Sequence, residues 1–405
     1  MADPGHLHDC DVAVVGGGLI GIAAALGVAQ QGRRVALVEP NPPRVIRGEL
    51  GLDLRTLALS PASRALLQRL GGWIDVPAAP YRRMEIWEER GTRTMTFDAA
   101  EVGRAELGWI VENGPLCAEL WAAAAGHDRV TVHDSRLLDL QPGPAGVALD
   151  LGDRQLQARL LVAADGAASA VRQRLGVAVQ TYQTGQCALA TVVRTAYPHQ
   201  GTAYQRFLLD GPLALLPGAD PHLCSVVWSQ SEGQAERRQA LPAAAFCEEL
   251  EQAVQSCLGR VEAVDQRLAF PLKQQLAATF NPQPRVLLLG DAARVIHPLA
   301  GLGANLGLED VGAMLAELEH LGAAADPGGA GQWRALDRRR QARSRLMLWV
   351  MAGLGQVYAR GDPLSQWVRN MGVRWLDGAL PIKRQIMREA MGLGRAGRTL
   401  TGARD

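Results

Sequence analysis

Short apolar runs and helical periodicities alternate at the start of the chain. Residues 11–15 (DVAVV) are almost wholly apolar, small and apolar residues continue at helical spacing to about Gln31, and residues 34–38 (RVALV) form a second apolar run. Runs of this kind are typical of parallel strands that helices cover on both faces. The pattern therefore predicts a strand, a helix and a second parallel strand at the start of the fold.

The rest of the chain changes texture twice. Alternating strands with one helix are predicted between about 180 and 275, and the chain from Gly303 onward reads as mostly helical. Ser60 followed by Pro61 is typical of a helix start. Further predicted helices are 61–70, 113–125, 243–258 and a long stretch over 332–358, and further predicted strands are 155–164, 203–209, 223–228 and 285–289. The pattern predicts an α/β protein in which a β-rich substrate domain is inserted into a nucleotide-binding domain.

Composition narrows the class of protein. The chain has 405 residues, 48% hydrophobic and 20% charged, which suffices for two packed domains, and a net charge of +1 gives no field that would attract nucleic acid. Six cysteines without a CxxC pair favour reduced cytoplasmic thiols over a disulfide frame, and we expect no metal site. No signal peptide and no spanning apolar run is apparent, so any membrane contact is expected to be peripheral, at the inner face.

The first chemical motif lies between the opening strand and its helix. Gly16-x-Gly18-x-x-Gly21 permits a tight turn and a close backbone approach, and Glu39 ends the next strand, where its carboxylate can accept ribose hydroxyls. A helix N-terminus in this position favours a pyrophosphate. The motif predicts dinucleotide binding, although FAD and NAD both use it.

Two later motifs decide between these dinucleotides. Residues 164–172 (ADGAASAVR) and 290–305 (GDAARVIHPLAGLGAN) each place an Asp directly after a predicted strand. Alone, such an Asp is most often a helix cap or a turn former. In this order after the glycine motif, the sequence resembles the class A flavoprotein aromatic hydroxylases of the para-hydroxybenzoate hydroxylase type, and most of all the ubiquinone-biosynthesis hydroxylases. The likeness also covers blocks at 53–60, 81–88, 108–113, 211–217, 306–310, 381–383 and 390–392.

The resemblance implies a Rossmann-type FAD-binding domain with an interleaved β-rich substrate domain and C-terminal helices. The expected division is 1–75 for the FAD-binding βαβ part, 76–110 for substrate-domain strands, 111–180 for the continued FAD-binding domain, 181–280 for the β-rich substrate domain, 281–330 for the GD segment and its helix, and 331–405 for the C-terminal helical region.

The resemblance also implies cofactors and site residues. Glu39 would bind the adenosine ribose, Arg55 would lie near the FAD phosphates, Asp291 would bind the ribityl chain, and Asp165 would serve both FAD and NADH or NADPH. Residues 298–303 would line the flavin ring, with the next helix N-terminus favouring reduced, anionic flavin. The expected cofactor-binding set is Gly16, Gly18, Gly21, Glu39, Arg55, Asp165, Gly290, Asp291, Pro298, Gly301, Gly303 and Asn305.

The implied activity is hydroxylation of an aromatic ring. NAD(P)H would reduce FAD, O2 would form a flavin C4a-hydroperoxide, and its distal oxygen would pass to the ring, so the cofactor supplies the difficult chemistry. The expected catalytic residues are His297 and Pro298; His297 either assists deprotonation of the phenol or is a structural residue of the turn. The substrate implied is a hydrophobic polyprenyl phenol or quinol of ubiquinone biosynthesis.

Three positions depart from the family pattern. Cys117 stands where these hydroxylases often have Gln, Leu302 replaces the Gln of the GQG turn, and Arg294 replaces His or Gln after GDAA. Each change alters a polar contact near the expected flavin. Two alternatives therefore remain beside the main hypothesis: hydroxylation of a soluble aromatic compound, and a flavin-binding accessory role with little turnover.

Two further segments have two interpretations each. Residues 203–217, with Tyr204 and Phe207, form either a substrate-facing surface or plain β-core. Ile382, Ile386 and Ala390 share one face of a basic helix, which either rests on an anionic membrane or packs on its own protein. Other ubiquinone-biosynthesis proteins are the expected protein partners.

Overall fold

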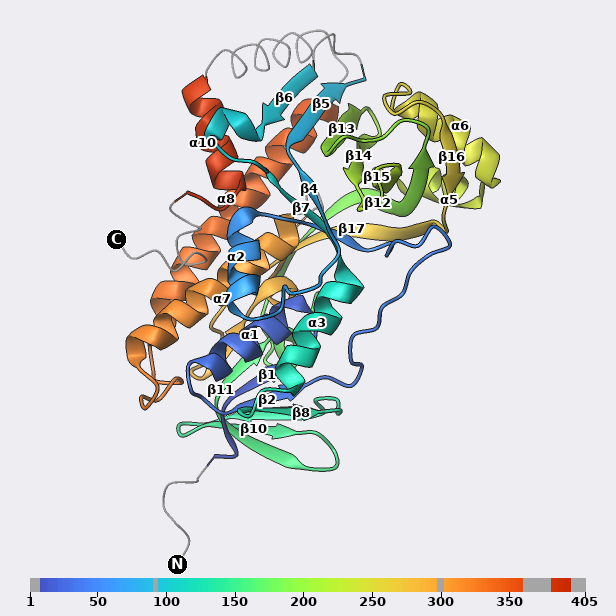
Figure 1. Cartoon of the computed structure of the whole chain (residues 1–405). Coiled ribbons are helices and arrows are strands. Elements are labelled where there is room, and N and C mark those ends of the chain that lie inside the picture. Colours follow the sequence, from blue (N-terminus) through green and yellow to red (C-terminus); the bar gives the residue numbers. More distant parts are fainter. Residues whose placement is uncertain (1–7, 90–93, 297–301, 360–379, 395–405) are drawn as a thin grey trace, which may run out of the picture.

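A parallel sheet lies at the centre of one half of the molecule (Figure 1). The computed structural model describes residues 8–89, 94–296, 302–359 and 380–394. The strand order is β8-β2-β1-β11-β10-β9, with β18 beside β11, and β9 and β10 form an antiparallel extension. The strands are β1 (Cys10–Val15), β2 (Val35–Val38), β8 (Val130–His133), β9 (Asp139–Pro142), β10 (Val147–Asp150), β11 (Gln155–Ala163) and β18 (Val286–Leu288).

Alternate residues of β1 enter two different cores. Val12 and Val14 pack with the helices on one face, whereas Ala13 and Val15 pack on the other face, with Phe280 among their neighbours. This burial on both faces explains why the strand carries an unbroken apolar run. The helices of this half are α1 (Leu19–Gln30), α2 (Pro61–Arg69), α3 (Asn113–Ala125), α4 (Ala170–Arg174), α7 (Leu302–Leu321) and α8 (Arg334–Ala359).

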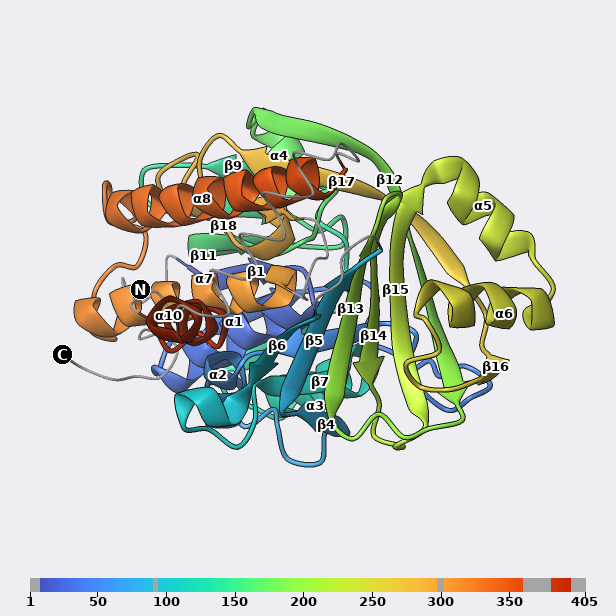
Figure 2. The same ribbon diagram turned by 90° about the horizontal axis from the view of Figure 1, so that it is seen from above.

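A mixed sheet forms the other half, with α5 and α6 on its outer face and the parallel-sheet half on its inner side (Figure 2). The order is β19-β17-β12-β15-β14-β13-β5-β6, with β16 beside β12. The elements are β5 (Arg83–Glu88), β6 (Thr94–Asp98), β12 (Val179–Thr195), β13 (Thr202–Leu208), β14 (Gly211–Pro217), β15 (Leu223–Ser231), β16 (Val261–Val264), β17 (Leu268–Ala277), β19 (Arg294–Val295), α5 (Glu232–Ala240) and α6 (Ala243–Ala253). Its outer core contains Trp228 and Phe246.

Smaller elements connect the two halves. A three-stranded sheet of β3 (Thr56–Leu59), β7 (Gly108–Glu112) and β4 (Ala78–Tyr81) contacts the mixed sheet, where the Thr56 hydroxyl donates to the Ser225 hydroxyl at 2.8 Å. The short helices η1 (Ala99–Val102) and η2 (Gly290–Ala292) and the helix α10 (Leu380–Ala390) complete the described elements. Met387 of α10 is buried beside η1 and β6. No helix among the described residues is long and apolar enough to cross a membrane.

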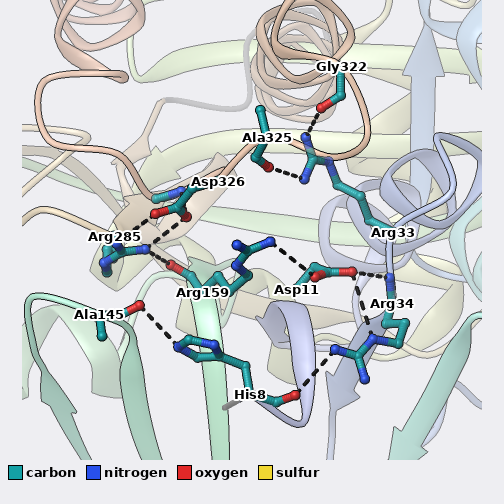
Figure 3. A network of polar contacts seen from close by, with 11 residues as sticks. His8, Asp11, Arg33, Arg34, Ala145, Arg159, Arg285, Gly322, Ala325 and Asp326 are labelled. Atoms are coloured by element: carbon teal, nitrogen blue, oxygen red, sulfur yellow. Dashed lines mark hydrogen bonds and ion pairs between the residues drawn. The ribbon is translucent and has the colours of Figure 1, made fainter. Parts of the chain in front are cut away.

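An arginine network fastens the loop after α7 to the amino ends of β2 and β18 (Figure 3). Arg33, which is 1% exposed, donates to the carbonyls of Gly322 (2.6 Å) and Ala325 (3.0 Å), just past the end of α7. Arg285 pairs with Asp326 in the same loop at 2.7 Å. These contacts add charge-assisted hydrogen bonds to two carbonyls of the loop that follows α7.

Most predicted elements are confirmed. Ser60 is the N-cap of α2, its hydroxyl accepting the Ser63 N–H at 3.2 Å, and α3 begins at Asn113 as expected. The helix predicted over 243–258 ends earlier, at Ala253, because Gln255 and Ser256 adopt left-handed backbone conformations.

Candidate active site

The glycine turn fits closely between β1 and α1. Gly16 has a φ of +108°, and a Cβ on Gly21 would lie 1.8 Å from the Gly16 carbonyl oxygen, so neither position accepts a side chain. A Cβ on Gly18 would have no neighbour within 4 Å, and Gly18 caps α1 without a side-chain hydrogen bond. The first turn of α1 therefore faces open space in which a phosphate can approach backbone N–H groups.

Glu39 lies beside this turn, as the motif predicts. One carboxylate oxygen accepts the Gly17 N–H at 2.6 Å and the other accepts the Asn41 N–H at 2.8 Å. Each oxygen retains lone-pair capacity for a hydroxyl donor. The contact orients the carboxylate at the end of β2, although its role toward ribose stays a prediction.

Arg55, Cys117 and Asp291 come from distant parts of the chain but share one electrostatic neighbourhood. Burial raises the pKa of the Cys117 thiol to about 11, against the opposing effects of the Arg55 charge and a hydrogen bond with the Leu19 backbone. Burial likewise raises the pKa of Asp291, while Arg294 and Arg55 act to lower it. Part of the Asp291 residue nevertheless remains exposed to solvent. The Arg55 charge therefore acts both on Cys117, beside the first turn of α1, and on Asp291 of the Gly290-Asp291 turn.

Only one carboxylate oxygen of Asp165 has a hydrogen-bond partner among the described residues. Its Oδ2 accepts the Val171 N–H at 3.2 Å, whereas its buried Oδ1 has no partner within the described part of the chain. A Cβ on Gly16 would lie 2.8 Å from the backbone nitrogen of Asp165, so the backbone at this residue directly adjoins the glycine turn. A buried acceptor without a donor is suited to a ligand whose hydroxyl group can donate to it.

Asn305 has a structural task that the sequence did not reveal. Its side-chain oxygen accepts the Ser60 N–H (2.9 Å) and the Ser63 hydroxyl (2.7 Å), and its nitrogen donates to the Ala58 carbonyl (2.7 Å). Asn305 thereby ties the first turns of α7 to the start of α2. Gly303, two residues earlier, has open space beside its Cα.

Asp310 is the functional candidate that the motif analysis missed. Its fully buried carboxylate accepts the Gly290 N–H at 3.0 Å and hydrogen bonds from Arg294 (2.6 Å) and Arg340 (2.5 Å). The signal in the sequence was two charged residues, Glu309 and Asp310, inside the otherwise apolar stretch 306–316 of the helix. His297, Pro298 and Gly301 lie outside the described residues, and Leu302 is the first residue of α7.

Two other features do not belong to the cofactor neighbourhood. Tyr204 packs with the outer core of the mixed sheet and meets Trp87 edge-on, with ring centroids 6.3 Å apart, so it does not face the parallel-sheet half. A small cleft beside the three-stranded sheet, lined by residues including Leu52, Thr56 and Gly218, contains none of the expected cofactor residues. Part of the 203–217 pattern is therefore explained by β-core.

Comparisons with known proteins agree with this geometry. The family model "FAD binding domain" matches residues 9–345. The 3-demethoxyubiquinol 3-hydroxylase of Escherichia coli is 36% identical over 392 residues, covering 95% of this chain and 98% of its own. Ubiquinone hydroxylase UbiL of Rhodospirillum rubrum is 31% identical (96% and 90% covered), and human ubiquinone biosynthesis monooxygenase COQ6 is 30% identical (93% and 91% covered).

Solved structures show the same fold. The p-nitrophenol 4-monooxygenase PnpA of Pseudomonas putida superposes with a TM-score of 0.75 at 19% identity, covering 98% of this chain and 99% of its own. HpxO of Klebsiella pneumoniae, in complex with FAD and uric acid, superposes with a TM-score of 0.71 at 19% identity (95% and 97% covered). The predicted α/β fold class is confirmed.

These findings define the class: the chain belongs to the FAD-binding-domain family of flavin-dependent aromatic-ring monooxygenases. Within this family, its named relatives are hydroxylases of ubiquinone biosynthesis. The open space at Gly18 and the uncommitted Asp165 oxygen fit FAD, the cofactor that the family model describes.

Proposed function

We propose that this protein hydroxylates the aromatic ring of a polyprenyl phenol or quinol intermediate of ubiquinone biosynthesis, with NADH or NADPH as electron donor. The observation that carries the proposal is the 36% identity, over nearly the full length of both chains, to 3-demethoxyubiquinol 3-hydroxylase. The arrangement of the glycine turn, Glu39 and Asp291 supports it, because these residues come together at one end of the parallel sheet.

The described residues would divide the work of holding FAD. Backbone N–H groups at the start of α1 would bind the pyrophosphate with Arg55 adding a positive charge, Glu39 would accept ribose hydroxyls, and Asp291 would accept from the ribityl chain. When bound, the flavin supplies the activation of O2. The protein supplies position and exclusion of water, and the catalytic assignments of His297 and Pro298 remain part of the proposal.

The substrate ring would lie between this end of the parallel sheet and the inner face of the mixed sheet. On that side, Leu216 of β14 packs with Ala58 and Ile110 of the small sheet. Apolar side chains here suit an aromatic ring with a hydrocarbon tail. Since Tyr204 points to the opposite face, we assign it no substrate contact.

The test follows the visible spectrum of the purified protein. We expect bound FAD, anaerobic bleaching of the flavin by NADH or NADPH that accelerates with a 2-polyprenylphenol analogue, and incorporation of ¹⁸O from labelled O2 into the ring. Acceleration by a soluble phenol alone would favour a soluble aromatic substrate. Bound flavin that neither nucleotide reduces would instead favour the accessory role suggested by Cys117, Leu302 and Arg294.

We further propose that α10 contacts an anionic membrane surface from the side. Ile382 and Ile386 are 41% and 44% exposed on one face, and Arg384 and Arg388 are exposed nearby. Lys383, the neighbour of Ile382 in the chain, is instead buried at 4% exposure, where it pairs with Glu101 at 3.0 Å.

Vesicle binding tests this contact. The double substitution Ile382→Ser and Ile386→Ser should reduce co-sedimentation with phosphatidylglycerol vesicles while lowering thermal stability only slightly, because 41% and 44% of these residues already face water. A matched control is Leu346→Ser with Trp349→Ser, which removes two exposed apolar residues from α8. Equal loss in both double variants would contradict a specific role for α10. Co-purification with other ubiquinone-biosynthesis proteins is the corresponding test of the expected protein partners.

A further inference from the structure

A buried charge cluster surrounds Asp310 in the middle of α7. Its Oδ2 accepts from the Gly290 N–H and from Arg294, and its Oδ1 accepts from Arg340, which also donates to Glu309 at 3.0 Å and to the Leu306 carbonyl at 3.0 Å. Asp310 thereby joins the Gly290-Asp291 turn, β19, α7 and α8. A buried carboxylate with three charge-assisted or backbone donors is held in a single orientation.

Arg294 is the member of this cluster that departs from the family pattern. It is 3% exposed, and its guanidinium commits Nη1 to Asp310 while the buried Nη2 has no partner within the described part of the chain. Three arginines (294, 340 and 343) face two carboxylates (Glu309 and Asp310) here, a surplus of one positive charge. A neutral Gln or His at 294 would remove that surplus.

The structure assigns Arg294 as a positioning residue for the flavin: through Asp310 it fixes the Gly290-Asp291 turn, and it places a positive charge beside the Asp291 carboxylate. This inference rests on the proposed placement of FAD. The charged groups that act on Asp291 are Arg294 from β19, Arg55 from the segment before β3, and Asp310 from α7. Of these three charges, that of Arg294 has the largest effect on the pKa of Asp291. It lowers this pKa, whereas burial raises it by favouring the neutral carboxyl.

The pH dependence of FAD affinity separates this role from simple support of the fold. Asp291 has a raised pKa, so FAD affinity should fall on the acid side as the carboxylate takes up a proton. Arg294→Gln removes the cation that opposes this rise. The acid limb of the curve of FAD affinity against pH should therefore move to higher pH, so that FAD binds more weakly at each pH on that limb.

Two variants act as controls in the same titration, read by quenching of FAD fluorescence. Arg294→Lys keeps the charge and should restore most of the acid limb, although it loses the planar fork. Arg343→Gln removes a cation of the same cluster that pairs with Glu309 at 3.5 Å and not with Asp310, so it should leave the limb in place.

The outcomes of this titration distinguish a positioning role of Arg294 from simple support of the fold. A limb that moves in Arg294→Gln, recovers in Arg294→Lys and stays in Arg343→Gln supports the inference. Affinity that falls by the same factor at every pH, or a limb that moves equally in Arg343→Gln, overturns it, because support of the fold alone predicts that result. A wild-type protein that binds no FAD refutes the proposed function itself, whereas wild-type binding with an unmoved Arg294→Gln limb refutes this inference alone.

Discussion

Two glycines of the same turn have opposite surroundings, which allows a sharp test of the cofactor site. A Cβ on Gly21 would lie 1.8 Å from the Gly16 carbonyl oxygen, whereas a Cβ on Gly18 would meet nothing within 4 Å. Gly21→Ala should therefore lower the free energy of unfolding by about 3 kcal/mol or more, because the overlap is with backbone that cannot move aside.

Gly18→Ala is the matched variant. Its φ of −79° suits alanine, so the free energy of unfolding should change by less than about 1 kcal/mol. FAD affinity should nevertheless drop, because the methyl group occupies the space through which a phosphate approaches the first turn of α1. Urea unfolding and FAD titration measure the two effects; unaltered FAD affinity in Gly18→Ala would contradict the placement of the cofactor.

For single residues, the sequence predicted roles whose partners are close in the chain but not roles whose partners are distant in the chain. The Ser60 cap was predictable because its partner, Ser63, is three residues away. The role of Asn305 was not, because its partners Ser60 and Ala58 lie more than 240 residues earlier in the chain. Asp310 was concealed for the same reason, since its contacts with Arg294 and Arg340 exist only after α7 and α8 pack.

Among the elements, the buried strands and the long helices follow directly from periodicity. Residues 12–15 of β1 and the whole of β2 are unbroken apolar runs because both of their faces are covered, and such runs differ clearly from polar loops. Strand β12 was harder to delimit, because its first half is exposed and polar and only its second half is buried. Its pairing with β17 also shifts register between Gln183 and Gln186, which hides a simple alternation.

The C-terminal end of α7 depends on one of two neighbouring arginines. Arg33 is buried and donates to the carbonyls of Gly322 and Ala325, whereas the Arg34 side chain is 41% exposed and lies 3.9 Å from Asp11 (Figure 3). Arg33→Gln should cost about 2–4 kcal/mol of unfolding free energy, because it removes a buried guanidinium and its two charge-assisted hydrogen bonds to the loop after α7.

Arg34→Gln removes the same charge from the adjacent position and should cost less than about 1 kcal/mol, as an exposed ion pair contributes little. Chemical denaturation of both variants at the same ionic strength provides the comparison. Similar losses in the two variants would show that α7 does not depend on these carbonyl contacts.

For the molecule as a whole, the division into two halves could be predicted from the sequence, because buried apolar runs give way to alternating strands. How the two halves pack against each other could not be predicted. The chain leaves the parallel sheet after β2 and returns to it at β8, β11 and β18, so strands distant in sequence become neighbours. Periodicity predicted the strands at 11–15, 34–38, 155–164 and 285–289 but not β8, and it gave no order for them beyond the Rossmann-type fold that the family resemblance implies. The convergence of Arg55, Cys117 and Asp291 follows from that order and from no local pattern.

Thiols in both halves of the molecule make its free energy of unfolding depend on pH in alkaline solution. Burial raises the pKa of Cys117 and Cys257 to about 11 and that of Cys10 and Cys224 to about 12, from an ordinary value of 9.0. Between pH 9 and 11 the unfolded chain therefore loses protons that the folded chain retains. The contribution of these thiols to folding stability is fully present below pH 9 and is lost above it, at up to about 5.4 kcal/mol per pH unit for the four. Burial also raises the pKa of Cys187 and Cys247, which add to this loss.

Urea unfolding at pH 8 and at pH 10.5, under reducing conditions, measures this loss. Cys10→Ala should reduce the slope by about 1.4 kcal/mol per pH unit, because one of the four thiols no longer contributes. The phenol of Tyr81, whose pKa burial raises to about 12, adds to the loss only above pH 10, so the interval from pH 9 to 10 isolates the thiols. A free energy of unfolding that stays constant across that interval would mean that the four thiols ionise as readily in the folded protein as in the unfolded chain, and hence that the two cores admit water at these positions.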